Sequence, residues 1–564
     1  MNFFDFAWST TLQLTKKAPN ELKILLHDEL KYPYLGRDSK GYVLHLIKPK
    51  IVDEKTAIFQ GLPFNLQNPT HKKIIWYLFK ASVYHLAMHL IHSNFTIYSK
   101  WAKGKNVNLS TFVASIVEDA VIKEQLKNVS LWMMPEIAYA NTVSYLRMKN
   151  VNELFSDISR VMASILMKFN IGKVKGKLED EVLTDVKAVV SILRKAAKNP
   201  TVNERLGAAN KIYDALHVYG GEPFEIPSLL YTESHGTNDP YYEERIPGNE
   251  EIEKVLPNAV KVLEGKVKNE KSFERAMEQI GGNEAQRNLN AWREHEKSKF
   301  KILKNYAEIG KDTAFEDFLF PREDYSEYHR KRELLSSPIR RILQRLRMLK
   351  NVGGEDFRKE SGIVDLQEAI QVIASQSQRT DIFVREELQT REDAWSILID
   401  ASHSLSMFKG EVQGIALCLA EVAKQLILNQ NSWGMYAFNN KFYIVKDFSE
   451  KYNARVKARI GGLTHGGFTY LPDGITVATQ ALTKRMEESR VLVIVSDFFP
   501  AGYDDIEGKL KDVIRKIERL GIGIIGIGVN STAVRKYVRP NCVVEHPYDL
   551  MKKFTKAFIE YSTS

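Results

Sequence analysis

Short apolar runs alternate with amphipathic helical stretches over the last third of the chain. The strand-like runs are AWSILID (394–400), SWGMYAF (432–438), KFYIV (441–445), VLVIVSD (491–497) and GIGIIGIGV (521–529). Helical spacing of apolar residues separates them at 411–428, after Asp473, at 505–520 and at 548–561. This alternation predicts an α/β domain with a Rossmann-like, doubly wound and mostly parallel sheet. Asn439 and Asn440 form a two-residue turn, which predicts a hairpin with an antiparallel edge strand.

The earlier part of the chain predicts a mainly α-helical N-terminal region. After a strand-like run at 41–47, apolar residues surround the stretch 72–95 and recur at helical spacing over 111–126. A further helical stretch covers 150–217, and Gly, Pro, Asn and charge then gather in a linker or long surface loop. The predicted domains are a helical domain (1–217), the linker or loop (218–250), a charged helical region (251–390) and the α/β domain (391–564).

Composition limits the class of protein. Of the 564 residues, 44% are hydrophobic and 27% are charged, a balance typical of a folded globular chain. Two cysteines are too few for a disulfide framework, a zinc ribbon or an iron–sulfur cluster. The net charge of +10 comes from interspersed charges of both signs and does not indicate nucleic acid. Because no apolar run approaches about 18 residues, we expect no membrane span and a cytoplasmic location.

Hydroxyl and carboxylate side chains follow the strands of the predicted α/β domain. Asp400, Ser402 and Ser404 form a D-x-S-x-S run at the end of one strand, and Asp497 ends another. Thr469 lies in a glycine-rich loop between them, with Thr464 and Thr476 nearby. Since these oxygens are hard ligands and should meet at one sheet edge, they predict a Mg²⁺ site. The alternative is that the serines cap a helix and Asp497 forms a turn.

These residues resemble the von Willebrand factor A (VWA) domain with its metal-ion-dependent adhesion site (MIDAS). The resemblance covers roughly 391–564 and implies that Ser402, Ser404 and Thr469 ligate Mg²⁺ or Mn²⁺. Asp400 and Asp497 would act directly or through water, and His403 would lie at the rim. An ion held mainly by neutral hydroxyls keeps an open position, which an acidic side chain of another protein can fill. No nucleophile with an adjacent base is visible in this domain, so we expect no enzymatic activity from it.

The segment before the predicted α/β domain indicates which type of VWA protein the chain resembles. Residues 337–350 form a predicted basic helix with an apolar stripe at Ile339, Ile342, Leu343, Leu346 and Leu349. The stripe favours packing on the domain over binding an acidic protein or nucleic acid. The segment, with Ile116-Val117-Glu118-Asp119-Ala120 further upstream, resembles activators of the NorD, CbbO and CobT type. That resemblance implies a MoxR-type AAA+ ATPase hexamer and a client enzyme as partners, and the chain contains no G-x-x-x-x-G-K-[ST] motif of its own.

The N-terminal half of the chain contains a second candidate metal site. His85, His89 and His92 fall on one helix face, and Glu118 lies on the next predicted helix. This spacing is that of zinc peptidases, but Leu86 stands where they require a Glu base. A Zn²⁺ site at His85, His89 and Glu118 therefore competes with a buried hydrogen-bonded cluster. The sequence leaves three hypotheses: an adaptor for an ATPase, a metal-dependent hydrolase, and a stand-alone VWA scaffold.

Overall fold

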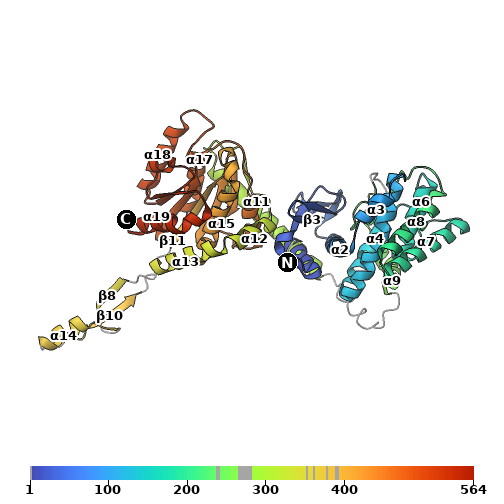
Figure 1. Cartoon of the computed structure of the whole chain (residues 1–564), viewed down its shortest axis with the longest axis horizontal. Helices are drawn as coiled ribbons and strands as arrows, with labels where there is room; N and C mark the ends of the chain where they lie inside the picture. Colours follow the sequence, from blue (N-terminus) through green and yellow to red (C-terminus); the bar gives the residue numbers. More distant parts are fainter. Residues whose placement is uncertain are drawn as a thin grey trace. The chain divides into compact units, whose positions relative to one another are not determined.

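The structure, a computed structural model, describes residues 3–236, 242–264, 283–350, 354–359, 363–375, 379–387, 393–427 and 429–563. The chain forms two compact units, Met1–Ser298 (unit 1) and Lys299–Ser564 (unit 2) (Figure 1). Their boundary differs from the boundaries predicted at 217, 250 and 390. The physical reason is that the region predicted as separate, 251–390, supplies buried apolar side chains to the cores of both units, such as Trp292 in unit 1 and Ile342 in unit 2.

Unit 1 begins with a helix and two small sheets. The sheet order is β1-β3-β2 in the first and β4-β5-β6 in the second. The elements are α1 (Phe3–Thr15), β1 (Leu22–His27), β2 (Tyr34–Asp38), β3 (Gly41–Ile47), β4 (Lys50–Ile51), β5 (Thr56–Phe59) and β6 (Leu62–Asn65). The strand predicted at 41–47 is confirmed as β3, which pairs in parallel with β1 and antiparallel with β2.

The two predicted helices are confirmed as α2 (Pro69–His92) and α4 (Val107–Val129). Asn68 caps α2 by accepting from the backbone N–H of Thr70 and His71, and Pro69 stands at the first helical position. Helix α2 is long and apolar enough to cross a membrane, but 94% of its apolar window is buried inside the structure. Burial on nearly every side explains why its apolar residues show no single stripe, because α1, α4 and α5 (Met134–Arg147) pack around it.

The segment predicted as a linker or surface loop, 218–250, is instead packed into unit 1. Residues 225–232 are buried, whereas 237–241 lie outside the described residues. Burial is possible because its backbone finds partners: Leu230 N–H donates to Ser144 Oγ at 3.1 Å, and His235 N–H donates to Ser228 Oγ at 2.8 Å. The other α-helices among the described residues of this unit are α3 (Thr96–Trp101), α6 (Asp157–Ile171), α7 (Asp180–Lys198), α8 (Val202–His217), α9 (Asn249–Glu264) and the first part of α11 (Asn283–Ile309).

Unit 2 contains the predicted α/β sheet, whose seven strands have the order β16-β15-β14-β11-β12-β13-β7. The strands are β7 (Phe318–Leu319), β11 (Asp393–Asp400), β12 (Trp433–Phe438), β13 (Phe442–Lys446), β14 (Ser489–Ser496), β15 (Gly523–Val529) and β16 (Asn541–Val544). The predicted hairpin at Asn439 and Asn440 is confirmed, because β13 runs antiparallel to β12. Strand β13 is not the edge strand, since the short β7 pairs in parallel along its outer side.

Helices cover both faces of this sheet (Figure 1). One face packs against α12 (Tyr325–Leu334), α13 (Ser336–Lys350), α15 (Lys409–Leu426), α16 (Ala454–Gly461) and α19 (Leu550–Thr563). The other packs against α17 (Leu471–Thr483), α18 (Ile506–Arg519) and the end of α11. Burial from both sides explains why β11 and β14 are almost continuously apolar. The chain between α13 and β11 contains β8 (Gly354–Lys359), β9 (Ile363–Val364), α14 (Leu366–Ala374) and β10 (Phe383–Glu387).

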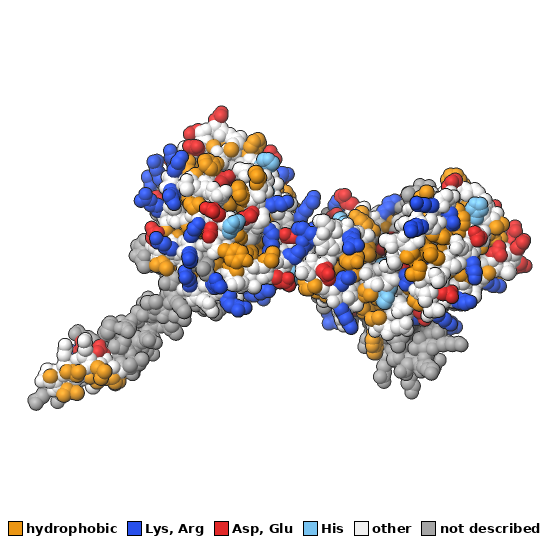
Figure 2. All heavy atoms as spheres, viewed as in Figure 1, with side chains coloured by type: hydrophobic (Ala, Val, Ile, Leu, Met, Phe, Trp, Pro, Cys, Tyr) orange, Lys and Arg blue, Asp and Glu red, His pale blue; other side chains and the backbone are white. Residues whose placement is uncertain are grey.

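Helix α13 confirms the packing interpretation of the basic segment. Its apolar stripe is buried in the core with α15 and α19, at Ile339, Ile342, Leu343 and Leu346. The side chain of Leu349 lies outside the described residues. Arg340, Arg341 and Arg345 are exposed on the opposite side. Basic and acidic side chains are interspersed over the surface in view, as the sequence predicted (Figure 2).

Ile342→Ala should destabilise unit 2 by about 2–5 kcal/mol, because it removes a fully buried side chain and leaves a cavity. Arg341→Ala, one position earlier and exposed, should change stability by less than about 0.5 kcal/mol. Hydrogen exchange of β11 and β14 in the full chain measures both effects. Equal protection in the two variants would contradict the packing of α13 on the sheet.

Candidate metal site at the carboxyl edge of the sheet

The D-x-S-x-S loop and the Asp497 loop leave the sheet side by side. Strands β11 and β14 are parallel neighbours, with Ile399 paired to Val495. Asp400 ends β11, and Ser496 ends β14 immediately before Asp497. The register therefore brings both loops to the carboxyl edge of the sheet, where ligands bind in open α/β folds.

Asp400 is fixed by hydrogen bonds on both carboxylate oxygens. Its Oδ1 accepts from Ser402 N–H at 2.9 Å, and its Oδ2 accepts from Ser496 Oγ–H at 2.6 Å. Ser496 Oγ in turn accepts from Phe498 N–H at 3.0 Å. Sequence reasoning missed Ser496, although its place before Asp497 at a strand end was a usable signal. This serine orients Asp400 without belonging to the predicted ligand set.

The two serines of the D-x-S-x-S run bring their hydroxyls together. Ser402 Oγ lies 3.0 Å from Ser404 Oγ. Ser402 is fully buried, whereas Ser404 is exposed. A short 3-10 helix, η4 (His403–Phe408), begins after Ser402, but the Ser402 side chain makes no capping hydrogen bond to it. The alternative that Ser402 serves as a helix cap is therefore wrong, and its hydroxyl remains available to a ligand.

Backbone hydrogen bonds tie the glycine-rich loop to both other loops. Thr469 exchanges two hydrogen bonds with Ala501, at 3.0 and 3.2 Å. On the other side, Gly466 N–H donates to Ala401 O at 2.9 Å, and His403 N–H donates to Gly467 O at 3.1 Å. Thr469 is only 3% exposed. The backbone thus holds a buried threonine between the loops that carry Asp400 and Asp497, as the prediction required.

The nearby alternatives to Thr469 are less suitable. Thr476 commits its hydroxyl to Pro472 O at 2.8 Å inside α17, and Thr464 is exposed. Asp497 Oδ1 accepts from Phe499 N–H at 3.0 Å, so the turn role suggested for Asp497 is present and occupies one oxygen. His403 is exposed at the rim. The metal-ligand roles of the five residues stay predictions, and their placement is compatible with them.

Two buried carboxyl groups influence each other at this edge. Burial, and then the charge of Asp497, raise the pKa of Asp400 to about 7. The main influences on the Asp400 carboxyl are burial, Asp497, Ser402 and Ser496, and they include no Lys or Arg side chain. Buried negative charge without a cationic partner is costly, and a bound cation would remove that cost. The donor set of hydroxyls and carboxylates fits Mg²⁺ or Mn²⁺.

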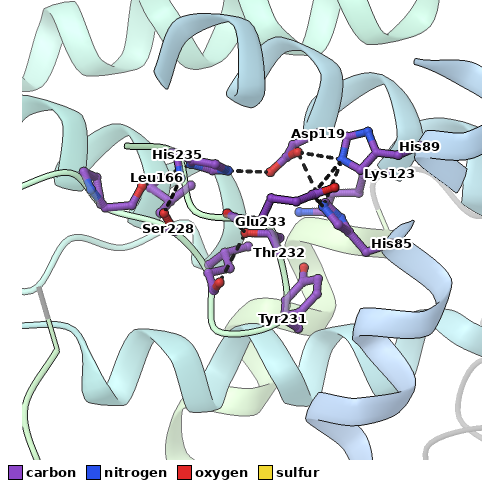
Figure 3. Close-up of polar contacts among 12 residues, drawn as sticks. His85, His89, Asp119, Lys123, Leu166, Ser228, Tyr231, Thr232, Glu233 and His235 are labelled. Atoms are coloured by element: carbon purple, nitrogen blue, oxygen red, sulfur yellow. Dashed lines mark hydrogen bonds and ion pairs between the residues drawn. The ribbon is translucent and has the colours of Figure 1, made fainter. Parts of the chain in front are cut away.

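The zinc ligand set predicted for unit 1 requires a correction. Glu118 does not face the histidines: its carboxylate accepts from Arg205 Nη1 at 3.1 and 2.9 Å and from Tyr98 Oη at 2.9 Å. The carboxylate that does face His85 and His89 is that of Asp119, the next residue of α4 (Figure 3). One residue turns the side chain by about 100° around a helix, so the neighbour of the predicted ligand occupies its place.

Three comparisons with known proteins each found a match to part of the chain. The family model of the von Willebrand factor type A domain matches residues 396–540. An uncharacterized protein of Pseudomonas aeruginosa is 24% identical over 143 residues, which cover 24% of this chain and 23% of that protein. The chain thus spans about a quarter of that relative's length. A solved structure, the manganese-loaded TRAP protein of Plasmodium vivax, shares 15% identity at a TM-score of 0.25, covering 30% of this chain and 74% of that one.

Together with the sheet order and its helical cover, the family match defines the class of fold. Residues 396–540 form a VWA domain, preceded by a largely helical unit 1. VWA domains typically bind a divalent metal ion at a MIDAS. In this chain the D-x-S-x-S loop and the Asp497 loop lie at the carboxyl ends of β11 and β14.

Asp400→Asn should stabilise the metal-free protein at pH 8 by on the order of 1–3 kcal/mol, because it removes one of two buried, mutually repelling charges. The folded pKa is raised, so the cost of ionising Asp400 is absent below about pH 4 and fully present above about pH 7. Thermal unfolding with and without Mg²⁺ measures this. Mg²⁺ should stabilise the unaltered chain and not the variant; an equal Mg²⁺ shift in both would contradict the site.

Proposed function

We propose that this protein is an adaptor that docks onto an acidic side chain of another protein through a divalent ion held by its VWA domain. The ion, Mg²⁺ or Mn²⁺, would be held at Asp400, Ser402, Ser404, Thr469 and Asp497. The observation that carries the proposal is the convergence of a buried carboxylate and two serine hydroxyls, 3.0 Å apart, at the carboxyl edge of the sheet.

The charge at such a site favours an acidic partner. Serine and threonine hydroxyls are neutral ligands, so an ion that they hold keeps much of its positive charge. Mg²⁺ prefers six oxygen ligands, and a carboxylate from another chain can supply one that the protein does not. Attraction between this carboxylate and the ion makes docking depend on the metal. Because the serine and threonine hydroxyls would coordinate the ion, none of them would be free to act as a nucleophile. This supports an adaptor rather than a hydrolase.

The three loops of the candidate site also carry large, exposed apolar side chains. Met407, Phe468 and Phe499 are 88%, 57% and 60% exposed, and each comes from a different one of the three loops. Exposed apolar groups on the loops of a polar centre are typical of protein interfaces, where they exclude water from the central contact. We infer that the partner presents its acidic residue within an apolar surface.

A MoxR-type AAA+ ATPase hexamer is the partner that the resemblance to NorD, CbbO and CobT proteins favours. These 564 residues carry no phosphate-binding G-x-x-x-x-G-K-[ST] motif, so ATP-driven remodelling of a client enzyme would require the ATPase. In this proposal the VWA domain contacts one party in the cytoplasm and unit 1 the other. A stand-alone VWA scaffold, without an ATPase, is the second candidate function.

Asp400→Ala and Ser404→Ala should each reduce Mg²⁺-dependent capture of a MoxR-type ATPase or of the client at least tenfold, because each removes an oxygen from the ion. His403→Ala, between the two serines and exposed, is the matched control and should bind normally. Circular dichroism verifies the fold of each variant. Capture that persists in EDTA would contradict metal-dependent docking, and an ATPase whose rate the chain does not change would favour the scaffold.

Phe468→Ala and Phe499→Ala should weaken the same interaction, each by about 1–2 kcal/mol, while leaving Mg²⁺ binding intact. Met486→Ala is the control, because Met486 is 97% exposed but precedes β14 at the amino-terminal end of that strand. Titration calorimetry with the partner measures the affinities. An equal loss from all three variants would place the interface elsewhere.

A further inference from the structure

A second cluster of metal-binding side chains lies in unit 1, at residues that the proposed docking function does not use. His85 and His89 project from α2, Asp119 from α4, and Glu233 from the loop that follows α8 (Figure 3). The histidines are buried, at 7% and 2% exposure. Three chain segments distant in sequence thus direct imidazole and carboxylate groups toward one point.

The atoms of this cluster lie at the separations of metal ligands. His85 Nε2 and His89 Nε2 are 3.0 Å apart, and Asp119 Oδ1 lies 3.6 and 3.2 Å from them. Glu233 Oε2 lies 3.0 and 3.4 Å from the same two nitrogens. Four ligands placed tetrahedrally about 2.0–2.1 Å from Zn²⁺ would be roughly 3.3 Å from one another. The five separations that involve the two histidine nitrogens, 3.0–3.6 Å, bracket that value.

Proton counting also favours a cation at this point. Carboxylate oxygens only accept, and a neutral imidazole has a single N–H. His89 Nδ1 lies 2.7 Å from Ser93 Oγ, which fixes the ring so that Nε2 points into the cluster. The two Nε2 atoms therefore face each other and two carboxylates. Without an ion, the two Nε2 atoms and the two carboxylate oxygens share at most two N–H protons. A single divalent cation would interact with all four atoms.

His235 contacts the proposed ligand Asp119 in the way that residues around a metal site hold its ligands in place. His235 Nδ1 lies 3.1 Å from Pro227 O, which only accepts, so this nitrogen carries a proton. His235 Nε2 then lies 3.2 Å from Asp119 Oδ2, the oxygen turned away from the histidine pair. When both ring nitrogens of His235 carry protons, Nε2–H donates to this oxygen and holds the Asp119 carboxylate in one orientation.

We propose that His85, His89 and Asp119 bind a Zn²⁺ ion, with Glu233 as the fourth ligand. The ion would hold the loop bearing Glu233 and His235 against α2 and α4. This loop is part of the segment that composition predicted to be a linker. The role of the ion is structural. Four protein ligands leave no open position, position 86 is Leu, and the adjacent cavity of about 30 Å³, lined by Met88, Leu166 and Phe169 among others, holds only one or two waters.

Metal analysis of the full chain, purified without a histidine tag, tests this proposal. Asp400→Asn serves as the background, so that the VWA domain does not contribute a Zn²⁺ site. We expect one Zn²⁺ per chain, and loss of at least nine-tenths of it in His89→Ala. His92→Ala, on the same helix but outside the cluster, should retain the metal. Glu233→Gln, a nearly isosteric change, should weaken binding at least tenfold if His89→Ala fails to fold.

Two further measurements separate a metal site from a hydrogen-bonded cluster. Co²⁺ substitution should give the visible absorption of a four-coordinate ion, and chelation should increase hydrogen exchange in residues 227–236. Less than one-tenth equivalent of Zn²⁺ after reconstitution, or equal metal content in His89→Ala and His92→Ala, would overturn the proposal and leave the hydrogen-bonded cluster. Either result is independent of docking by the VWA domain.

Discussion

The burial of the Asp400 carboxylate is the constraint on which the account of unit 2 depends. This residue is fully buried, its oxygens accept from Ser402 and Ser496, and Asp497 raises its pKa. An ionised carboxylate in such a place is expensive unless a cation accompanies it. The sheet edge, the three loops and the two serines together form the proposed binding site for that cation. The proposed adaptor function follows, because an ion bound mainly by neutral oxygens still attracts a foreign carboxylate.

The same physics recurs in unit 1 with different donors. Asp119 and Glu233 are carboxylates in contact with histidines, and burial would raise their pKa values were it not for the imidazoles, which lower both below the usual range. Imidazole suits Zn²⁺, whereas the hydroxyl-rich edge of the VWA domain suits Mg²⁺. The chain would therefore use one ion to hold unit 1 together and a different ion to contact a partner.

How much the sequence could predict depended on how local each feature is. The strands of the VWA domain were predictable because a parallel strand buried on both faces is apolar throughout, and Asp400 and Asp497 directly follow such strands. Glu118 was the wrong ligand because spacing cannot tell which of two adjacent helical residues faces a neighbouring helix. Glu233 was missed because its loop reads as a linker, and only the fold shows Ser144 and Ser228 satisfying the backbone of that loop. The domain boundary differed because the charged helix α11 buries apolar side chains in both units, Trp292 in unit 1 and Ile302 and Tyr306 in the core of unit 2.

The most direct test of the central claim is a crystal structure of the full chain soaked with Mn²⁺, with data collected to show its anomalous scattering. The account predicts one peak in the VWA domain, within bonding distance of Ser402 Oγ and Ser404 Oγ and beside Asp400 and Asp497. No peak at these loops at saturating Mn²⁺, or a peak elsewhere in the domain, would contradict it.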